Sequence, residues 1–216
     1  MLLIAAQLLM KLGHLCPKVV RVYSEMQQNL DFPIPRDLLK PNKQRQKKEK
    51  LLEGISLHFL IRHRGKPYSE KIQYFDQLFR MNEDTPENVT DDQLKEYRQV
   101  IKKASIEELK GYDIVLCTCS GSSSKRLVQG TNIAQIIIDE CAMCMEPEAL
   151  IPLVAFSSAE KIVLIGDHKQ LKPIVINRDA KNLGLDRSLF ERYADKKTER
   201  YADKKTIMLN IQYRMV

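Results

Sequence analysis

The sequence predicts an α/β fold whose core is a doubly wound parallel sheet covered by helices. Three short apolar runs after Asp113, at residues 114–117, 136–138 and 161–165, alternate with short helical stretches. Continuous apolar runs of this length are typical of strands that are buried on both faces of a parallel sheet. A fourth run, at residues 19–23, lies far upstream. The long segment between it and the second run is therefore predicted to be an insertion between two strands of the sheet.

The elements before Asp113 follow from apolar spacing and charge. Within residues 1–35 the pattern predicts a helix and then the first strand. Pro33 and Pro35 then interrupt regular structure where the chain leaves the sheet. Residues 36–66 are strongly basic, with few acidic residues among them. This basic stretch opens the predicted insertion.

The segment that follows is helical in pattern. Apolar residues at helical spacing predict a helix over residues 68–81, and Thr90 or Asp91 can cap a second helix that runs to about Ala104. Ser105-Ile-Glu-Glu108 is a capping-box pattern, which predicts one further short helix.

Bulk composition bounds the class of protein. The 216 residues are 44% hydrophobic and 29% charged, as in ordinary globular domains. The five cysteines lack the spacing of a disulfide framework, which favours a reducing compartment, so the expected location is the cytoplasm, the nucleus or both. No apolar run is long enough to cross a bilayer, and residues 1–10 lack the basic start and cleavage site of a signal peptide. The formal charge of +7 favours a polyanionic partner such as nucleic acid, with solubility alone as the alternative.

One repeat differs from structural repeats. Residues 191–198 are copied letter for letter as residues 199–206. Structural repeats are tens of residues long and diverge. We therefore interpret the copy as a recent duplication or a gene-prediction error, which lengthens a connector and carries no function.

Two carboxylates follow the apolar run at residues 136–138. In a parallel sheet Asp139 and Glu140 lie at the C-terminal edge, where α/β proteins bind ligands. A carboxylate there can hold Mg²⁺ through water, and a second one can orient or deprotonate the water that attacks a phosphate. Asp139 suits the first role and Glu140 the second. The alternative is a solvated turn after an ordinary strand.

Two further segments carry polar residues suited to phosphate chemistry. Residues 166–173, Gly-Asp-His-Lys-Gln-Leu-Lys-Pro, leave the sheet after the last apolar run, and Gln170 could donate to a terminal phosphate or align a water. The alternative is a plain exit in which Gly166 serves the turn. In Gln212-Tyr-Arg-Met215, Arg214 could stabilise charge on a γ-phosphate and Tyr213 could stack on a base, with surface charge as the alternative for Arg214.

The order of these segments resembles that of the motifs of superfamily 1 helicases of the nonsense-mediated-decay type. Asp139-Glu-Cys-Ala142, residues 166–173 and residues 212–215 resemble motifs II, III and IV, and the second of these is highly specific to the group. Ile114-Val-Leu-Cys-Thr-Cys-Ser120 resembles the strand-and-threonine motif in which Thr118 would contact the nucleic-acid backbone. Further segments resemble the vertebrate members that carry zinc fingers, at residues 21–25, 145–152 and 182–192.

The resemblance implies a RecA-like doubly wound sheet of the P-loop NTPase type, with ATP and Mg²⁺ as cofactors and single-stranded RNA or DNA as the partner. It implies that Asp139 holds Mg²⁺ through water, Glu140 is the catalytic base and Gln170 senses the γ-phosphate. It also implies that Arg214 reaches that phosphate from the second motor lobe, with Tyr213 beside the adenine.

The resemblance divides the chain into four parts. Residues 1–35 would be a partial first RecA-like lobe and residues 36–111 a basic, helical insertion. Residues 112–206 would continue the first lobe with motifs II and III, and residues 207–216 would start the second lobe.

Two features depart from the family pattern. Cys141 stands where the family usually has Ala or Gly, and we expect the site to tolerate this small residue. The Gly-x-x-Gly-x-Gly-Lys-Thr loop that cradles phosphates does not occur in the sequence. We therefore expect an incomplete first motor lobe that does not hydrolyse ATP efficiently by itself.

Weaker candidates lie outside the motifs. The basic stretch could grip nucleic-acid phosphates, with a solvated face as the alternative, through Lys47, Lys48, Lys50, Arg62 and Arg64. Four cysteines could be read as a zinc site, although two lie on or beside a strand and one within motif II: Cys117, Cys119, Cys141 and Cys144.

Two functional alternatives remain. The first is a non-enzymatic module that binds nucleic acid or a protein partner and acts as a transcriptional cofactor, with the transcription-factor partners that the zinc-finger members imply. The second is a P-loop ATPase of another class, against which residues 166–173 argue.

Overall fold

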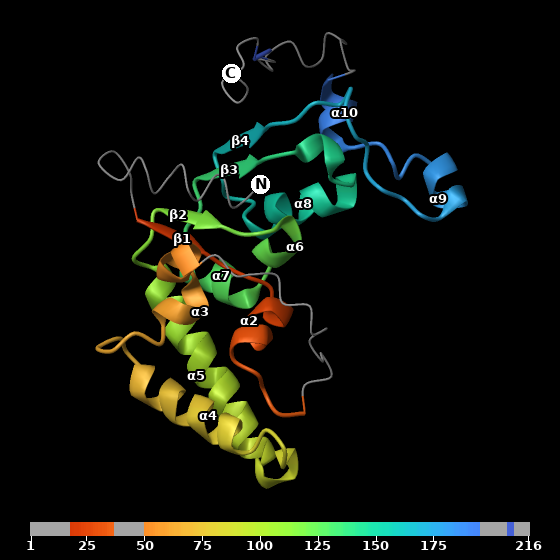
Figure 1. Ribbon diagram of the computed structural model, residues 1–216. Coiled ribbons are helices and arrows are strands. Elements are labelled where there is room, and N and C mark those ends of the chain that lie inside the picture. The colour runs from red at the N-terminus through yellow and green to blue at the C-terminus, as the bar shows by residue number, and fades with distance from the viewer. Residues whose placement is uncertain (1–17, 37–49, 195–206, 210–216) are drawn as a thin grey trace. The chain divides into compact units, whose positions relative to one another are not determined.

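The computed structural model describes residues 18–36, 50–194 and 207–209 (Figure 1). The chain divides into two compact units, residues 1–132 and residues 133–216, and each is described by itself. The predicted helix at the start of the chain and the duplicated octet from residue 195 onward lie outside the described residues.

The first unit contains two short parallel strands, β1 (Val19–Arg21) and β2 (Ile114–Leu116). Val20 lies opposite Val115, and the backbone N–H of Lys18 donates to the Asp113 carboxylate over 3.0 Å, which ties the two strand starts together. Both strands occur where the apolar runs predict them. The long helical segment of the sequence therefore lies between two paired parallel strands.

The other described elements of the first unit are helices. They are α2 (Glu25–Asp31), α3 (Leu57–Leu60), α4 (Ser69–Met81), α5 (Asp91–Leu109), α6 (Cys119–Ser122) and α7 (Lys125–Gly130), with 3₁₀ turns at Lys50–Ile55 and Pro86–Asn88.

The core of the insertion is an aromatic contact between α4 and α5, which lie side by side (Figure 1). The apolar face of α4 buries Ile72, Phe75 and Phe79, as the helical spacing predicts. The ring of Tyr97 on α5 meets Phe79 at 4.9 Å and Phe75 at 5.7 Å between centroids, both edge to face. Such pairs add to the stabilisation that comes from burial alone.

The start of α5 is confirmed and its predicted end is wrong. Thr90 caps the helix in a capping box, because its hydroxyl accepts from the backbone N–H of Gln93 over 3.2 Å and the Gln93 side chain accepts from the backbone N–H of Thr90 over 2.9 Å. The helix then continues through Ser105, which is fully buried. The reason is packing against α7, where Gly130 approaches so closely that a Cβ there would lie 3.2 Å from the Ile106 backbone. This buried face holds the helix beyond the local capping pattern.

The second unit also has a parallel pair, β3 (Gln135–Ile138) and β4 (Lys161–Leu164), with Ile138 opposite Leu164. Its helices are α8 (Glu146–Ala155), α9 (Arg178–Asn182) and α10 (Leu189–Ala194), with a 3₁₀ turn at Cys141–Met143. Helix α8 connects the two strands and packs on β3 (Figure 1).

The strands of the second unit differ from the prediction in their burial. Ile136 and Ile138 are buried, whereas Ile137 and Val163, opposite each other on the other face, are 59% and 39% exposed. The expectation of strands covered on both faces is thus wrong for the described part of this unit, because α8 is the helix packed on the sheet. The α/β class is confirmed, with two short parallel sheets. None of the described helices is both long and apolar enough to cross a membrane.

Candidate active site

The two polar segments that the sequence singles out leave the same edge of the β3–β4 sheet. Ile138 ends β3 opposite Leu164, so the chain continues into Asp139 on one strand and into Ile165 on the other. The N–H of Ile165 donates to the carbonyl of Ile138 over 2.9 Å, and the N–H of Cys141 donates to the carbonyl of Ile165 over 2.8 Å. The sheet register therefore extends into the two loops and holds them together.

Gly166 is required at this edge because of space. A Cβ at this position would lie 2.8 Å from the backbone nitrogen of Ala142 and 3.1 Å from its Cβ. Real Cβ atoms are not found so close to a backbone atom, and the backbone φ of Gly166 is not in the left-handed region. Gly166 thus serves the close approach of the two loops and not a turn that only glycine can adopt.

Glu140 has a strained backbone conformation. Its φ is +52°, in the left-handed region that non-glycine residues avoid, and this directs the chain from β3 into the 3₁₀ turn at Cys141–Met143. Such conformations cost about 1–3 kcal/mol and cluster at functional sites. Asp139 is exposed, its Oδ1 accepts from the N–H of Glu140 over 3.0 Å, and Glu140 is half-buried. Cys141 is completely buried, as suits a small residue in a tight site.

The second loop is ordered by Asp167. Its Oδ1 accepts from the N–H of Lys169 and its Oδ2 from the Gln170 amide, both over 2.9 Å. These bonds lower the pKa of Asp167, that from the Lys169 backbone most, because they favour the ionised carboxylate. The Gln170 amide has two protons, and one of them is engaged by Asp167. The second proton and the amide oxygen remain to face a ligand.

The site fits a hard cation held together with a phosphate. Among the described residues, no three His, Cys, Asp or Glu side chains gather as they do where protein alone encloses a metal. Mg²⁺ prefers a different arrangement, since it keeps several waters and binds through one or two carboxylates plus substrate phosphates. The exposed Asp139 supplies such a carboxylate at a sheet edge.

Comparison with known proteins identifies the family. Residues 16–178 match the family model described as an AAA domain. The 3'-5' exoribonuclease HELZ2 of Mus musculus is 42% identical over 203 residues, which are 92% of this chain and 6% of that protein. The Regulator of nonsense transcripts 1 homolog of Neurospora crassa is 35% identical over 160 residues, or 74% of this chain and 14% of that protein. ATP-dependent helicase NAM7 of Saccharomyces cerevisiae is 33% identical over 173 residues, or 80% of this chain and 16% of that protein.

The chain belongs to the superfamily 1 helicases of the nonsense-mediated-decay type. This family consists of ATP-dependent RNA and DNA helicases, and its ATP use implies Mg²⁺. The chain spans only a small part of the length of each relative above.

Thr118, which is predicted to contact the nucleic-acid backbone, lies in the first unit just after β2. It is exposed and caps α6, because its Oγ1 accepts from the N–H of Gly121 over 3.1 Å. The Ser120 hydroxyl lies 3.3 Å from the same oxygen. The hydroxyl proton of Thr118 can therefore go to Ser120 or to a phosphate. Thr118 and the carboxylates lie in different units, so the structure does not place them relative to one another.

The basic residues predicted to grip nucleic acid divide into two kinds. The side chain of Arg62 is only 9% exposed, pairs with Asp76 at 2.7 Å, donates to the hydroxyl of Tyr97 at 2.8 Å and covers the ring of Phe32 at 3.5 Å. Arg62 is thus occupied in packing α4 and α5 against Phe32 at the end of α2. Arg64 is exposed and has no ion pair among the described residues.

Several predicted residues lie outside the described part. These are Lys47, Lys48, Tyr213 and Arg214, and of Lys50 only the backbone is described.

The zinc alternative has no support from the described residues. Cys117 and Cys119 lie in the first unit, and Cys141 and Cys144 lie in the second. Burial, and secondarily Cys119, raises the pKa of the Cys117 thiol to about 11, which disfavours the thiolate that a metal needs.

A cavity in the first unit was missed at the sequence level. It lies between α2, α5 and α7, and its basic residues come from distant parts of the sequence. The one local signal is the spacing of Arg98 and Lys102, four residues apart on α5, which places both side chains on one face of the helix.

Proposed function

We propose that these residues form the ATP-hydrolysing edge of the first, RecA-like motor lobe of a helicase that moves along single-stranded nucleic acid, with RNA as the expected strand. The observation that carries the proposal is the contact of Gly166 with Ala142. It joins the loop of Asp139 and Glu140 to the loop of Gln170 at the C-terminal edge of two adjacent parallel strands. That edge is where α/β proteins bind nucleotides.

Each residue at the edge has a role in phosphoryl transfer. Asp139 holds Mg²⁺ through water, and Mg²⁺ neutralises charge on the phosphates. Glu140, half-buried beside it, orients and deprotonates the attacking water. Gln170 donates its free amide proton to the γ-phosphate while Asp167 holds the other. Arg214 and Tyr213 are proposed to complete the site from residues outside the described part.

The nucleic-acid side of the proposal rests on Thr118 and Arg64, which are both exposed, and on Lys47, Lys48 and Lys50. The phosphate-cradling loop is not among the 216 residues, so we propose that turnover also needs a loop of that kind. The four-part division of the chain and a cytoplasmic or nuclear location belong to the same proposal. No observation on this chain supports a transcriptional cofactor with transcription-factor partners.

The test is ATP turnover in the longest natural protein that carries these 216 residues, measured with and without single-stranded RNA while Mg²⁺ is varied. Asp139→Asn should raise the Mg²⁺ concentration for half-maximal turnover by about 10–100-fold, since a partner that holds a metal through water contributes that much. Asp179→Asn on α9, an exposed carboxylate in the same unit, is the matched control and should change nothing. ATP turnover that is the same with and without RNA would contradict the proposal. So would an unchanged Mg²⁺ requirement in Asp139→Asn.

A further inference from the structure

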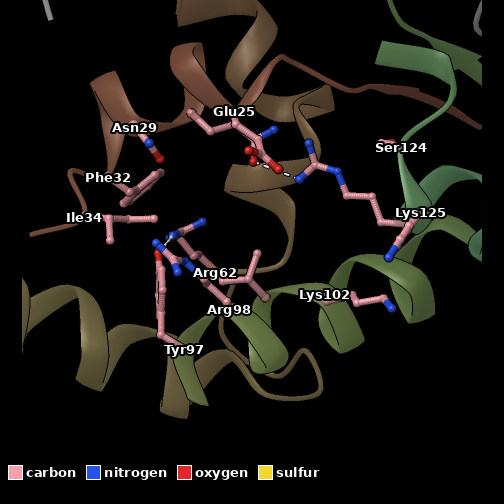
Figure 2. Close-up of a pocket in the computed structure, with 13 residues that line it drawn as sticks. Glu25, Asn29, Phe32, Ile34, Arg62, Tyr97, Arg98, Lys102, Ser124 and Lys125 are labelled. Atoms are coloured by element: carbon pink, nitrogen blue, oxygen red, sulfur yellow. Dashed lines mark hydrogen bonds between the residues drawn. The ribbon is translucent and has the colours of Figure 1, made fainter. Parts of the chain in front are cut away.

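A cavity of about 510 Å³ opens in the first unit between α2, α5 and α7 (Figure 2). Its walls come from four segments of the sequence: α2 and the residues after it as far as Ile34, Arg62, the middle of α5, and the start of α7. A volume of several hundred cubic ångströms is typical of sites for small organic ligands. It far exceeds what a single inorganic ion fills.

The cavity carries uncompensated positive charge. Five of its lining residues are cations, Arg62, Arg98, Lys102, Lys125 and Arg126, and one is an acid, Glu25. Arg62 is paired with Asp76. Arg126 donates to the Gln28 side chain over 3.0 Å and to the Tyr23 carbonyl over 3.2 Å.

The remaining three cations have no such partners. Arg98, Lys102 and Lys125 are exposed and make no hydrogen bond or ion pair with any other described residue. Figure 2 shows Lys102 on α5 and Lys125 on α7 at the same end of the cavity. That end is therefore suited to an anionic group.

A buried hydroxyl lies in the same wall. The Oγ of Ser124, next to Lys125, is inaccessible to solvent and has no hydrogen-bond partner in the described part of the chain. A buried hydroxyl without a partner is costly, so such groups are normally satisfied by protein, water or ligand. A ligand oxygen held next to Lys125 would supply an acceptor for it.

The wall also includes apolar surface. Ile34 and Ile101 line the cavity and are both half-buried. Ile101 directly precedes Lys102 on α5, whereas Ile34 lies across the cavity from that lysine (Figure 2). A cavity with apolar surface and a cationic end matches a ligand with an organic part and an anionic part. A nucleotide has this composition, with a base on one side of its sugar and a phosphate on the other.

We propose that this cavity binds one nucleotide unit, with its phosphate held by Lys102 and Lys125 beside the hydroxyl of Ser124 and its base against Ile101. In the helicase the source is a nucleotide of the bound single strand, and this part rests on the proposed function. A free nucleotide has the same chemistry, so the experiment distinguishes the two sources.

The experiment titrates the 216-residue chain with a fluorescent single-stranded RNA 12-mer over a range of salt concentrations, and separately with AMP. The test variant is Lys102→Ala/Lys125→Ala. The control is Lys103→Ala/Lys161→Ala, which removes the same charge from two exposed lysines outside the cavity. The test variant should bind RNA about tenfold more weakly and lose about 0.7 from the slope of log affinity against log salt for each phosphate contact removed. The control should bind like wild type.

The outcomes separate the two proposals. If RNA binds and the test variant matches the control in affinity and slope, the cavity inference is wrong and the helicase proposal stands. If no RNA binds but AMP binds and the test variant abolishes it, the cavity holds a free nucleotide and the single-strand proposal fails. If neither ligand binds, or if poly-glutamate competes as well as RNA through the same lysines, the cavity is no nucleotide site. Charge reversal in Lys102→Glu/Lys125→Glu should deepen the loss seen with alanine.

Discussion

Replacing Gly166 by alanine perturbs the contact on which the proposed site depends. The added Cβ would lie 2.8 Å from the Ala142 nitrogen and 3.3 Å from the Cys141 nitrogen, and both are backbone atoms. Neither can rotate away as a flexible side chain would, so the two loops must separate. Overpacking of this kind costs about 1–3 kcal/mol of unfolding free energy. For a unit of this size, each kcal/mol lowers the melting temperature by about 4–8 °C.

The matched control is Gly54→Ala. Gly54 has no atom within 4 Å of a built Cβ and its φ is not in the left-handed region. Alanine at such a position reduces the entropy of the unfolded chain and stabilises by about 0.4–1 kcal/mol. The two substitutions are chemically identical, and the structure predicts opposite signs for them.

The assay is urea unfolding followed by circular dichroism, because the chain contains no tryptophan. Gly166→Ala should shift the urea midpoint of the second unit downward without changing the slope, and Gly54→Ala should raise the midpoint of the first unit. If Gly166→Ala unfolds at the wild-type midpoint, the loops of Asp139 and Gln170 are not in contact through Gly166, and the reasoning is refuted.

Three further predictions concern other parts of the chain. Arg62→Ala should lower the free energy of unfolding by about 3–5 kcal/mol, because it leaves the mostly buried Asp76 without its cationic partner. Lys71→Ala, in a half-exposed ion pair, should lower it by less than about 1 kcal/mol. Urea unfolding measures both losses, and equal losses would refute this prediction. The pKa of the Asp167 carboxyl, followed by NMR titration, should lie below its ordinary value of 3.8. Any stability that the ionised carboxylate contributes is therefore present above pH 3.8 and is lost as the pH falls through the lowered pKa. A pKa at or above 3.8 would contradict this prediction. The rate of Cys117 alkylation should reach half its maximum near pH 11, because only the thiolate reacts. A half-maximum near pH 9 would show that burial does not raise the pKa of this thiol.

The sequence predicted the strands well because their signal is local. All four apolar runs form strands, paired in parallel as their composition indicates. A parallel pair puts the residues after both strands at one edge, so the meeting of the Asp139 and Gln170 loops also follows from the pattern. The physical basis is that short continuous apolar runs favour the strands of a parallel sheet over other elements.

The features that the sequence did not predict depend on contacts between distant residues. Arg62 is charged and lies in a basic stretch, yet Asp76 and Tyr97 on two later helices bury it. Ser105 carries a capping pattern, yet packing against Gly130 keeps it inside α5. Local spacing encodes neither partner.

The cavity of the first unit shows the same limit. Lys102 and Ser124 line the same cavity because α5 packs on α7, and neither segment alone has a binding motif. The sequence did not predict the role of Gly166, since a glycine after a strand is as typical of a turn as of two backbone segments in close contact. The structure shows the second, because Gly166 packs against the backbone of Ala142.

The most direct test of the account is the ATP turnover of Glu140→Gln at saturating single-stranded RNA, in the longest natural protein that carries these residues. The control is Glu160→Gln, an exposed carboxylate just before β4, at the opposite edge of the same sheet. Loss of the catalytic base should lower kcat by about 10²–10⁴-fold and leave nucleotide binding intact, while Glu160→Gln turns over like wild type. Unchanged turnover in Glu140→Gln, or an equal loss in both variants, would contradict the placement of the reaction at the Asp139–Glu140 edge.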